Sequence, residues 1–224
     1  ICGIGIQSSG SFIGGGCLNT VVGGFNVISG GCQSIIAGKG ITVIHSFIGG
    51  GQCQTILGSY GTVAGGFCNR TSCAHSSILG GTGNNAFGAG STIVGGATNQ
   101  TDSSQELSFI GGGQDNCIDG KGWNFIGGGL DNYAKGYIST IGGGNCNTIE
   151  GDTSTIGGGQ CNYAGGNVAS TLGGFQNCSF GDFPRDLVNV YLSIIMSPII
   201  KIFCFSIFWN ILFKLWKVIS LFNL

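Results

Sequence analysis

A six-residue pattern, Ser-x-Ile-x-Gly-Gly, recurs eleven times along the chain and limits the possible folds more than any other feature. Successive copies begin 15 to 20 residues apart, and six of the ten intervals are 15 residues. A repeat this regular is typical of a protein that stacks one small structural unit many times. The copies begin at Ser11, Asn26, Ser46, Gly61, Ser76, Ser91, Ser108, Asn124, Ser139, Ser154 and Ser170.

Each copy carries two short apolar motifs, which are clearest in STIGGGNCNTIEGDT at 139–153. We number the coil positions 1 to 15 from Ser139. Position 3 is apolar throughout, positions 5 and 6 are glycine in ten copies, and a second motif follows as Asn-x-apolar-x-Gly. We expect position 3 to form an inward ladder of side chains: Ile13, Ile28, Ile48, Val63, Ile78, Ile93, Ile110, Ile126, Ile141, Ile156 and Leu172.

These motifs predict an all-β fold, a parallel β-solenoid of about eleven coils of 15–16 residues within residues 1–183. A strand this short is unstable alone, but stacking coils at about 4.8 Å satisfies its backbone hydrogen bonds. Glycines at fixed offsets permit the tight corners between strands. A helix is excluded, because each interior glycine costs roughly 1 kcal/mol and no 3.6-residue period is present.

Composition excludes several other classes of protein. The chain has 47 glycines in 224 residues, but they lack the three-residue period of collagen. Its 42% hydrophobic content argues against disorder. Its net charge of −1 lacks the excess of positive charge that is typical of proteins that bind nucleic acid. No basic run precedes an apolar segment in residues 1–10, and no Met opens the chain, so we expect a fragment of a longer protein.

The small core of one coil raises the question of how many chains form the rod. Each coil supplies about two inward apolar side chains, such as Ile141 and Ile149, and small cores are only marginally stable. Identical chains that pack their inward faces around a common axis would enlarge the core. The alternative is a thin single-chain solenoid sealed by its own isoleucine ladder.

The recurring Ser-x-Ile-x-Gly-Gly and Asn-x-Ile-x-Gly unit resembles the head repeats of YadA-type trimeric autotransporter adhesins, and similar glycine-rich coils occur in viral fibres. This resemblance covers residues 11–183. It implies a left-handed β-roll, a homotrimer, display on a cell or virion surface outside the cell, and attachment to host-surface glycans or proteins. The chain departs from the family in its cysteine content, its glycine triplets and its longer coils.

Three pairs of cysteines share the same offset in adjacent copies: Cys17 with Cys32, Cys53 with Cys68, and Cys146 with Cys161. Stacked coils would place each pair about 4.8 Å apart at Cα, within the range for a disulfide. These pairs are therefore candidate inter-coil disulfides. The alternative is an unbonded column of small side chains, because the Cβ directions of stacked residues run parallel.

The remaining motifs predict no catalytic, cofactor or metal site, so we expect a protein that is not an enzyme. Gly38 and Lys39 resemble the end of a phosphate loop, but Gly40 stands where a Ser or Thr is required. The acidic residues lack the once-per-turn spacing of calcium-binding solenoids. A polysaccharide-active enzyme on a β-solenoid stays as a second alternative to attachment.

Outward-facing residues and inserted loops are the candidate binding features of the chain. Position 2 alternates between Phe and Thr, and a continuous threonine row would favour the first alternative function, binding to ice or another ordered surface. Insertions at 38–45 and 101–107 predict loops, and loops often carry recognition. We expect the second loop to supply ligand contacts through Asp102, Gln105 and Glu106.

The last part of the chain, residues 184–224, is predicted to be a separate hydrophobic tail. The run 187–213 is long enough to span a bilayer and would make the protein membrane-bound, but Pro198 and Lys201 lie in its middle. The alternative is translated noncoding sequence, since the segment consists mostly of residues with AT-rich codons.

Overall fold

The computed structural model describes residues 5–7, 9–38, 40–102 and 107–180. By its contacts the chain divides into Ile1–Arg185 and Asp186–Leu224. The predicted tail, including the run 187–213, lies outside the described residues.

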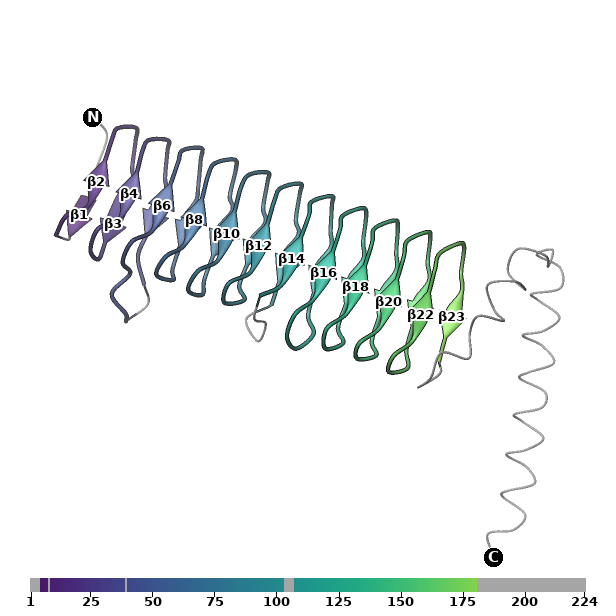
Figure 1. Cartoon of the computed structure of the whole chain (residues 1–224). Coiled ribbons are helices and arrows are strands. Elements are labelled where there is room, and N and C mark those ends of the chain that lie inside the picture. The colour runs from purple at the N-terminus through teal and green to yellow at the C-terminus, as the bar shows by residue number, and fades with distance from the viewer. Residues whose placement is uncertain (1–4, 8, 39, 103–106, 181–224) are drawn as a thin grey trace, which may run out of the picture. The chain divides into compact units, whose positions relative to one another are not determined.

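The described residues form a parallel β-solenoid of about eleven coils, as the repeat predicts (Figure 1). Each coil contributes one strand to each of two parallel sheets. The first sheet, sheet B, contains β1 (Gly5–Gln7), β3 (Thr20–Val22), β5 (Ile35–Ile36), β7 (Thr55–Ile56), β9 (Arg70–Thr71), β11 (Asn85–Ala86), β13 (Gln100–Thr101), β15 (Cys117–Ile118), β17 (Tyr133–Ala134), β19 (Thr148–Ile149), β21 (Tyr163–Ala164) and β23 (Cys178–Ser179). The second, sheet C, contains β2 (Phe12–Ile13), β4 (Val27–Ile28), β6 (Phe47–Ile48), β8 (Thr62–Val63), β10 (Ser77–Ile78), β12 (Thr92–Ile93), β14 (Phe109–Ile110), β16 (Phe125–Ile126), β18 (Thr140–Ile141), β20 (Thr155–Ile156) and β22 (Ser170–Thr171).

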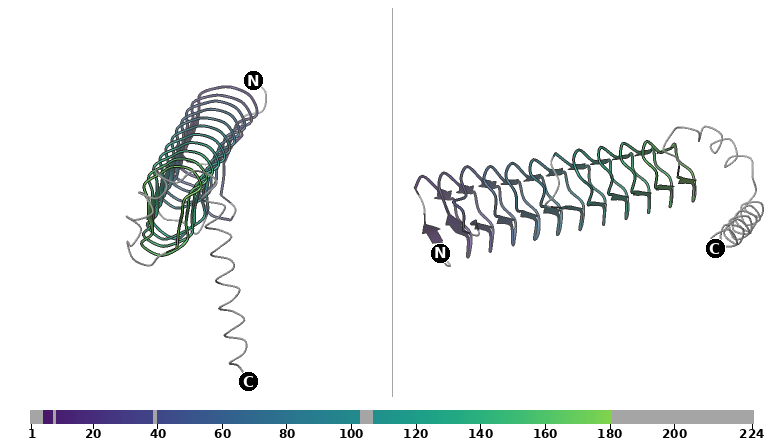
Figure 2. Two further views of the ribbon diagram at one scale, coloured as in Figure 1. Left: turned by 90° about the vertical axis from the view of Figure 1, so that its right-hand side faces the viewer. Right: turned by 90° about the horizontal axis from the view of Figure 1, so that it is seen from below.

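The core is built from two inward rows of side chains, one from each sheet. Position 3 of sheet C supplies Ile28 to Ile156, and position 11 of sheet B supplies residues such as Val21, Ile56 and Ile149. Both rows are fully buried and form one hydrophobic cluster. The coils follow one another with nearly the same outline (Figure 2), and the parallel register pairs equivalent inward residues, as Ile126 with Ile141 and Ile141 with Ile156.

The predicted ladder is correct at ten positions and wrong at the last. Ile13 packs against the core from the first coil, but Leu172 is 70% exposed and Thr171 occupies the inward position. The register pairs Ile156 with Thr171, so the last coil begins at Ala169 rather than Ser170. This register places Gly173 and Gly174 at positions 5 and 6, as in the other ten copies.

Glycine at position 6 is required by the close approach of one coil to the next. Gly144 has a φ of 99°, and a Cβ built on it would lie 2.1 Å from the carbonyl oxygen of Gly159. The Gly144 carbonyl in turn accepts hydrogen bonds from the backbone of Leu130 and from the side chain of Asn132, both at 2.9 Å. The corner therefore has no room for a side chain.

Two further corner positions, 8 and 15, adopt the left-handed backbone conformation without depending on glycine. Eighteen non-glycine residues there have φ between 53° and 60°. This conformation reverses the direction of the N–H group: Asn145 donates to Gly159 in the next coil, whereas Cys146 donates to Leu130 in the preceding one. The inter-coil hydrogen bond offsets a backbone strain of about 1 kcal/mol or more per residue.

The inward faces are already closed within one chain, because the ladder residues Ile28 to Ile156 are fully buried without a partner. Additional chains are not needed to cover them. The assembly of three chains and the left-handed sense of the coils stay predictions, and any trimer would have to use the outer faces.

Candidate functional site

The outer face of sheet B gathers a group of ionisable side chains. Positions 10 and 12 alternate with the buried position 11 and therefore both point outward. Parallel register then places residues from successive coils side by side. We call the resulting group the tyrosine–carboxylate patch, and it consists of Asp102, Cys117, Asp119, Tyr133, Lys135, Glu150 and Tyr163.

The same contact occurs twice in this patch, two coils apart. The Tyr133 hydroxyl donates a hydrogen bond to Asp119 Oδ2 at 2.9 Å, and the Tyr163 hydroxyl donates one to Glu150 Oε2 at 2.6 Å. In each case the tyrosine belongs to position 10 and the carboxylate to position 12 of the preceding coil. Lys135 lies in the carboxylate row, between Asp119 and Glu150.

The electrostatics of the patch keep its hydroxyl and thiol groups protonated at neutral pH. Burial, followed by the hydrogen bond to Asp119, raises the pKa of Tyr133 to about 12. Burial, followed by the negative charges of Asp119 and Asp102, raises the pKa of Cys117 to about 11. The hydrogen bond to Glu150, followed by burial, raises the pKa of Tyr163. Cys117 is therefore a poor nucleophile, since the thiolate is the reactive form.

The patch can act chemically as a binding surface. Each carboxylate keeps a second oxygen that can accept hydrogen bonds, Lys135 is exposed and can donate them, and the tyrosine rings are partly exposed. Exposed aromatic rings beside hydrogen-bonding groups suit ligands that have both hydroxyl groups and apolar faces.

The predicted ligand loop is only partly within the described residues. Asp102 lies there, at position 12, in the same row as Asp119. Gln105 and Glu106 lie outside it. In the sequence, both long insertions fall between a sheet B strand and the following sheet C strand, β5 and β6 for the first and β13 and β14 for the second.

The paired cysteines occupy the same position in adjacent coils, as their spacing predicts. Cys17 and Cys32 pair across a parallel bridge at position 7, and the other two pairs lie at position 8. The structure holds all six as thiols rather than as disulfides. Disulfide formation between them stays a prediction.

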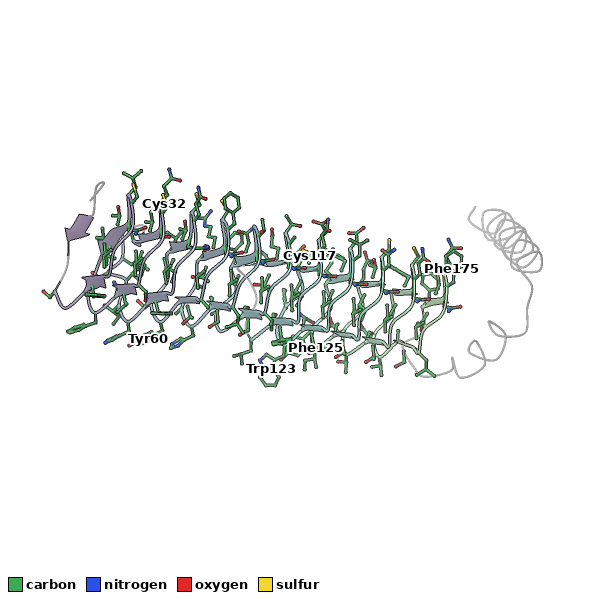
Figure 3. The ribbon with its side chains drawn as sticks, turned by 90° about the horizontal axis from the view of Figure 1, so that it is seen from above. Cys32, Tyr60, Cys117, Trp123, Phe125 and Phe175 are labelled. Carbon is green, nitrogen blue, oxygen red and sulfur yellow. The ribbon has the colours of Figure 1, made fainter. Side chains whose placement is uncertain are left out.

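An aromatic column, which the sequence reasoning missed, runs along position 15 of four successive coils. Phe25, His45, Tyr60 and His75 stack with ring centroids 5.4, 5.4 and 4.7 Å apart. The signal was present in the sequence, because all four precede the first residue of a copy. Figure 3 shows Tyr60 and Cys117 on opposite sides of the stack, so this column lies apart from the patch.

The outward row of sheet C alternates as predicted between aromatic and hydroxyl side chains. Phe109 and Phe125 stack at 5.4 Å, and Thr92 and Thr140 flank them in the same row. The phenylalanines interrupt the threonine array that binding to an ordered surface would require.

Within the described residues, no group of three or more His, Cys, Asp or Glu side chains is placed to hold a metal ion. The same part of the chain contains no helix long and apolar enough to cross a membrane. No protein-family model matches the chain, and no curated protein is significantly similar to it.

Proposed function

We propose that the chain is a structural attachment protein: an extracellular rod, displayed on a cell or virion surface, that binds a host-surface ligand through its outer faces. The observation that carries this proposal is the repeated tyrosine–carboxylate contact on the outer face of sheet B. A contact that recurs along a regular stack offers the same chemistry to a ligand that is itself repetitive.

The chemistry of the patch favours a glycan as the ligand. Asp119–Tyr133 and Glu150–Tyr163 are two coils apart, which corresponds to about 9.6 Å at the usual strand spacing. This distance is comparable with the length of a disaccharide, so neighbouring sugar units would meet equivalent groups. Three chains in one rod would strengthen weak contacts through high effective concentration.

Binding of the full chain to a panel of immobilised glycans tests the proposal. We expect Tyr133→Ala to weaken binding at least about tenfold, because it removes both the ring and the donor to Asp119. Tyr133→Phe retains the ring but lacks the hydroxyl group, so it separates the contribution of the ring from that of the hydrogen bond to Asp119. Tyr60→Ala is the matched control, since Tyr60 is an exposed tyrosine in the aromatic column outside the patch.

Two outcomes would contradict the proposal at different levels. Failure of the unaltered chain to bind any glycan on the panel would overturn the choice of ligand. Equal losses of binding for Tyr133→Ala and Tyr60→Ala would remove the patch as the binding site.

A further inference from the structure

Two pairs of cysteines lie in the left-handed corner column, which we define as the residues at coil position 8. Cys53 and Cys68 occupy adjacent coils near one end, and Cys146 and Cys161 occupy adjacent coils near the other. In each pair the two thiols lie close enough to influence each other electrostatically. All four side chains are at least partly exposed to solvent.

The backbone presents the two thiols of a pair in the same orientation. All four cysteines have φ between 53° and 59°, and each donates its N–H to the preceding coil, as Cys68 does to Gln52 and Cys161 to Asn145. The two side chains of a pair therefore leave the stack in parallel, separated by the coil spacing of about 4.8 Å.

This spacing fits a bridging ion better than it fits a disulfide. A disulfide prefers Cβ atoms about 3.5–4.5 Å apart, so parallel side chains at the coil spacing would have to converge. A zinc–thiolate bond is about 2.3 Å long, and two collinear metal–thiolate bonds of comparable length span a separation close to the coil spacing.

The surroundings of the pairs supply polar neighbours in the same column. The Cys53 thiol also donates to Gln33 Oε1 at 3.4 Å, and Asp131 precedes Cys146 in the column. Burial, then the hydrogen bond and charge of Cys53, raises the pKa of Cys68, and contact with Cys161 raises the pKa of Cys146. The thiols of Cys68 and Cys146 are therefore protonated at neutral pH until an ion displaces the protons.

We propose that each pair, Cys53–Cys68 and Cys146–Cys161, binds one soft monovalent ion of the Cu(I) class in linear two-sulfur coordination. Soft thiolate ligands select such ions, whereas structural zinc requires four ligands. On binding, two S–H bonds lose their protons to solvent and two sulfur–metal bonds form. The metal keeps its oxidation state, so the step needs no oxidant or reductant. This site is separate from the tyrosine–carboxylate patch and adds a function to the rod.

Titration of the reduced full chain with Cu(I), without oxygen and against a competing Cu(I) chelator, tests the proposal. We expect Cys146→Ser and Cys53→Ser each to lower the number of tightly bound ions by one per chain. Serine is close in size to cysteine, and the same column accepts Thr98 and Gln33, so these variants should retain the fold. X-ray absorption of the loaded protein should show two sulfur ligands for each copper ion.

Cys117→Ser is the matched control, because its row neighbours Gln100 and Tyr133 carry no thiol. We expect this variant to bind as many ions as the unaltered chain. The proposal is overturned if Cys146→Ser leaves the number of bound ions unchanged, if Cys117→Ser lowers it equally, or if each copper has a single sulfur ligand. A double variant, Cys146→Ser with Cys161→Ser, should lose no more than Cys146→Ser alone, and a further loss would also contradict the paired site.

Discussion

At the scale of single residues, the buried polar row at position 9 determines how well neighbouring coils are joined. Asn116 is a typical member: its Nδ2 donates to the carbonyl oxygens of Gly112 at 3.0 Å and Gly129 at 2.9 Å, and its Oδ1 accepts from Asn132. Gln54 occupies the same position in another coil, but its Nε2 is buried without a partner. The extra methylene displaces the amide from the carbonyl groups that an asparagine reaches.

Gln54→Asn is therefore expected to stabilise the protein by about 1–2 kcal/mol, because it supplies the missing hydrogen bonds of a buried donor. Asn116→Gln makes the reverse change and is expected to destabilise it by about 2–3 kcal/mol. Urea denaturation of both variants, followed by circular dichroism, measures the two shifts. Shifts of the same sign in the two variants would contradict this account of the row.

At the scale of the coil, only one of the two adjacent corner glycines is required by steric contact with the next coil. Gly96 has a φ of 84°, and a Cβ there would lie 1.9 Å from the Gly113 carbonyl oxygen. Its neighbour Gly95 would place a Cβ with nothing within 4 Å. We expect Gly96→Ala to lower the free energy of unfolding by about 3 kcal/mol or more, and Gly95→Ala to change it by about 0.5 kcal/mol or less. Comparable losses in the thermal unfolding of both variants would show that the clash does not control the corner.

The main features of a coil could be predicted from the sequence, but two of its details could not. The strands and the ladder could be predicted, because inward isoleucines and corner glycines recur at constant offsets. The register of the last coil could not, since Ser170 imitates the start of a copy while Thr171 replaces the usual isoleucine. The left-handed corners were also missed. Their inter-coil hydrogen bonds accept many residue types, so Leu18, Cys53 and Asp115 share no sequence signal.

Less of the candidate site could be predicted, because insertions of different length separate its residues in the sequence. Asp102, Asp119 and Glu150 fall in one row only after the insertions between them are assigned to corner loops. Their separations of 17 and 31 residues in the sequence correspond to one coil and two coils in the structure. The cysteine pairs were found because no insertion separates Cys53 from Cys68 or Cys146 from Cys161.

At the scale of the whole molecule, large apolar side chains remain exposed on the outer face of sheet C. The inward rows are closed within one chain, yet Phe12 is 58% exposed and Phe47 and Phe125 are each 40% exposed on the outer face of sheet C. Burial of such a row between chains would contribute about 25 cal/mol per Å² of apolar area. The trimer that the resemblance implies is therefore expected to form through this face rather than through the core.

Light scattering on the full chain tests this assembly, with and without reductant. We expect a mass of three chains in both conditions, because apolar contacts between outer faces do not depend on disulfides. The double variant Phe109→Thr with Phe125→Thr should yield single chains with an unchanged circular dichroism spectrum. Threonine fits this row, because Thr92 and Thr140 occupy the equivalent position in the flanking coils. A single-chain mass for the unaltered protein would contradict the trimer. If its unfolding temperature then fell on addition of reductant, disulfides between coils would account for the stability of the single-chain rod.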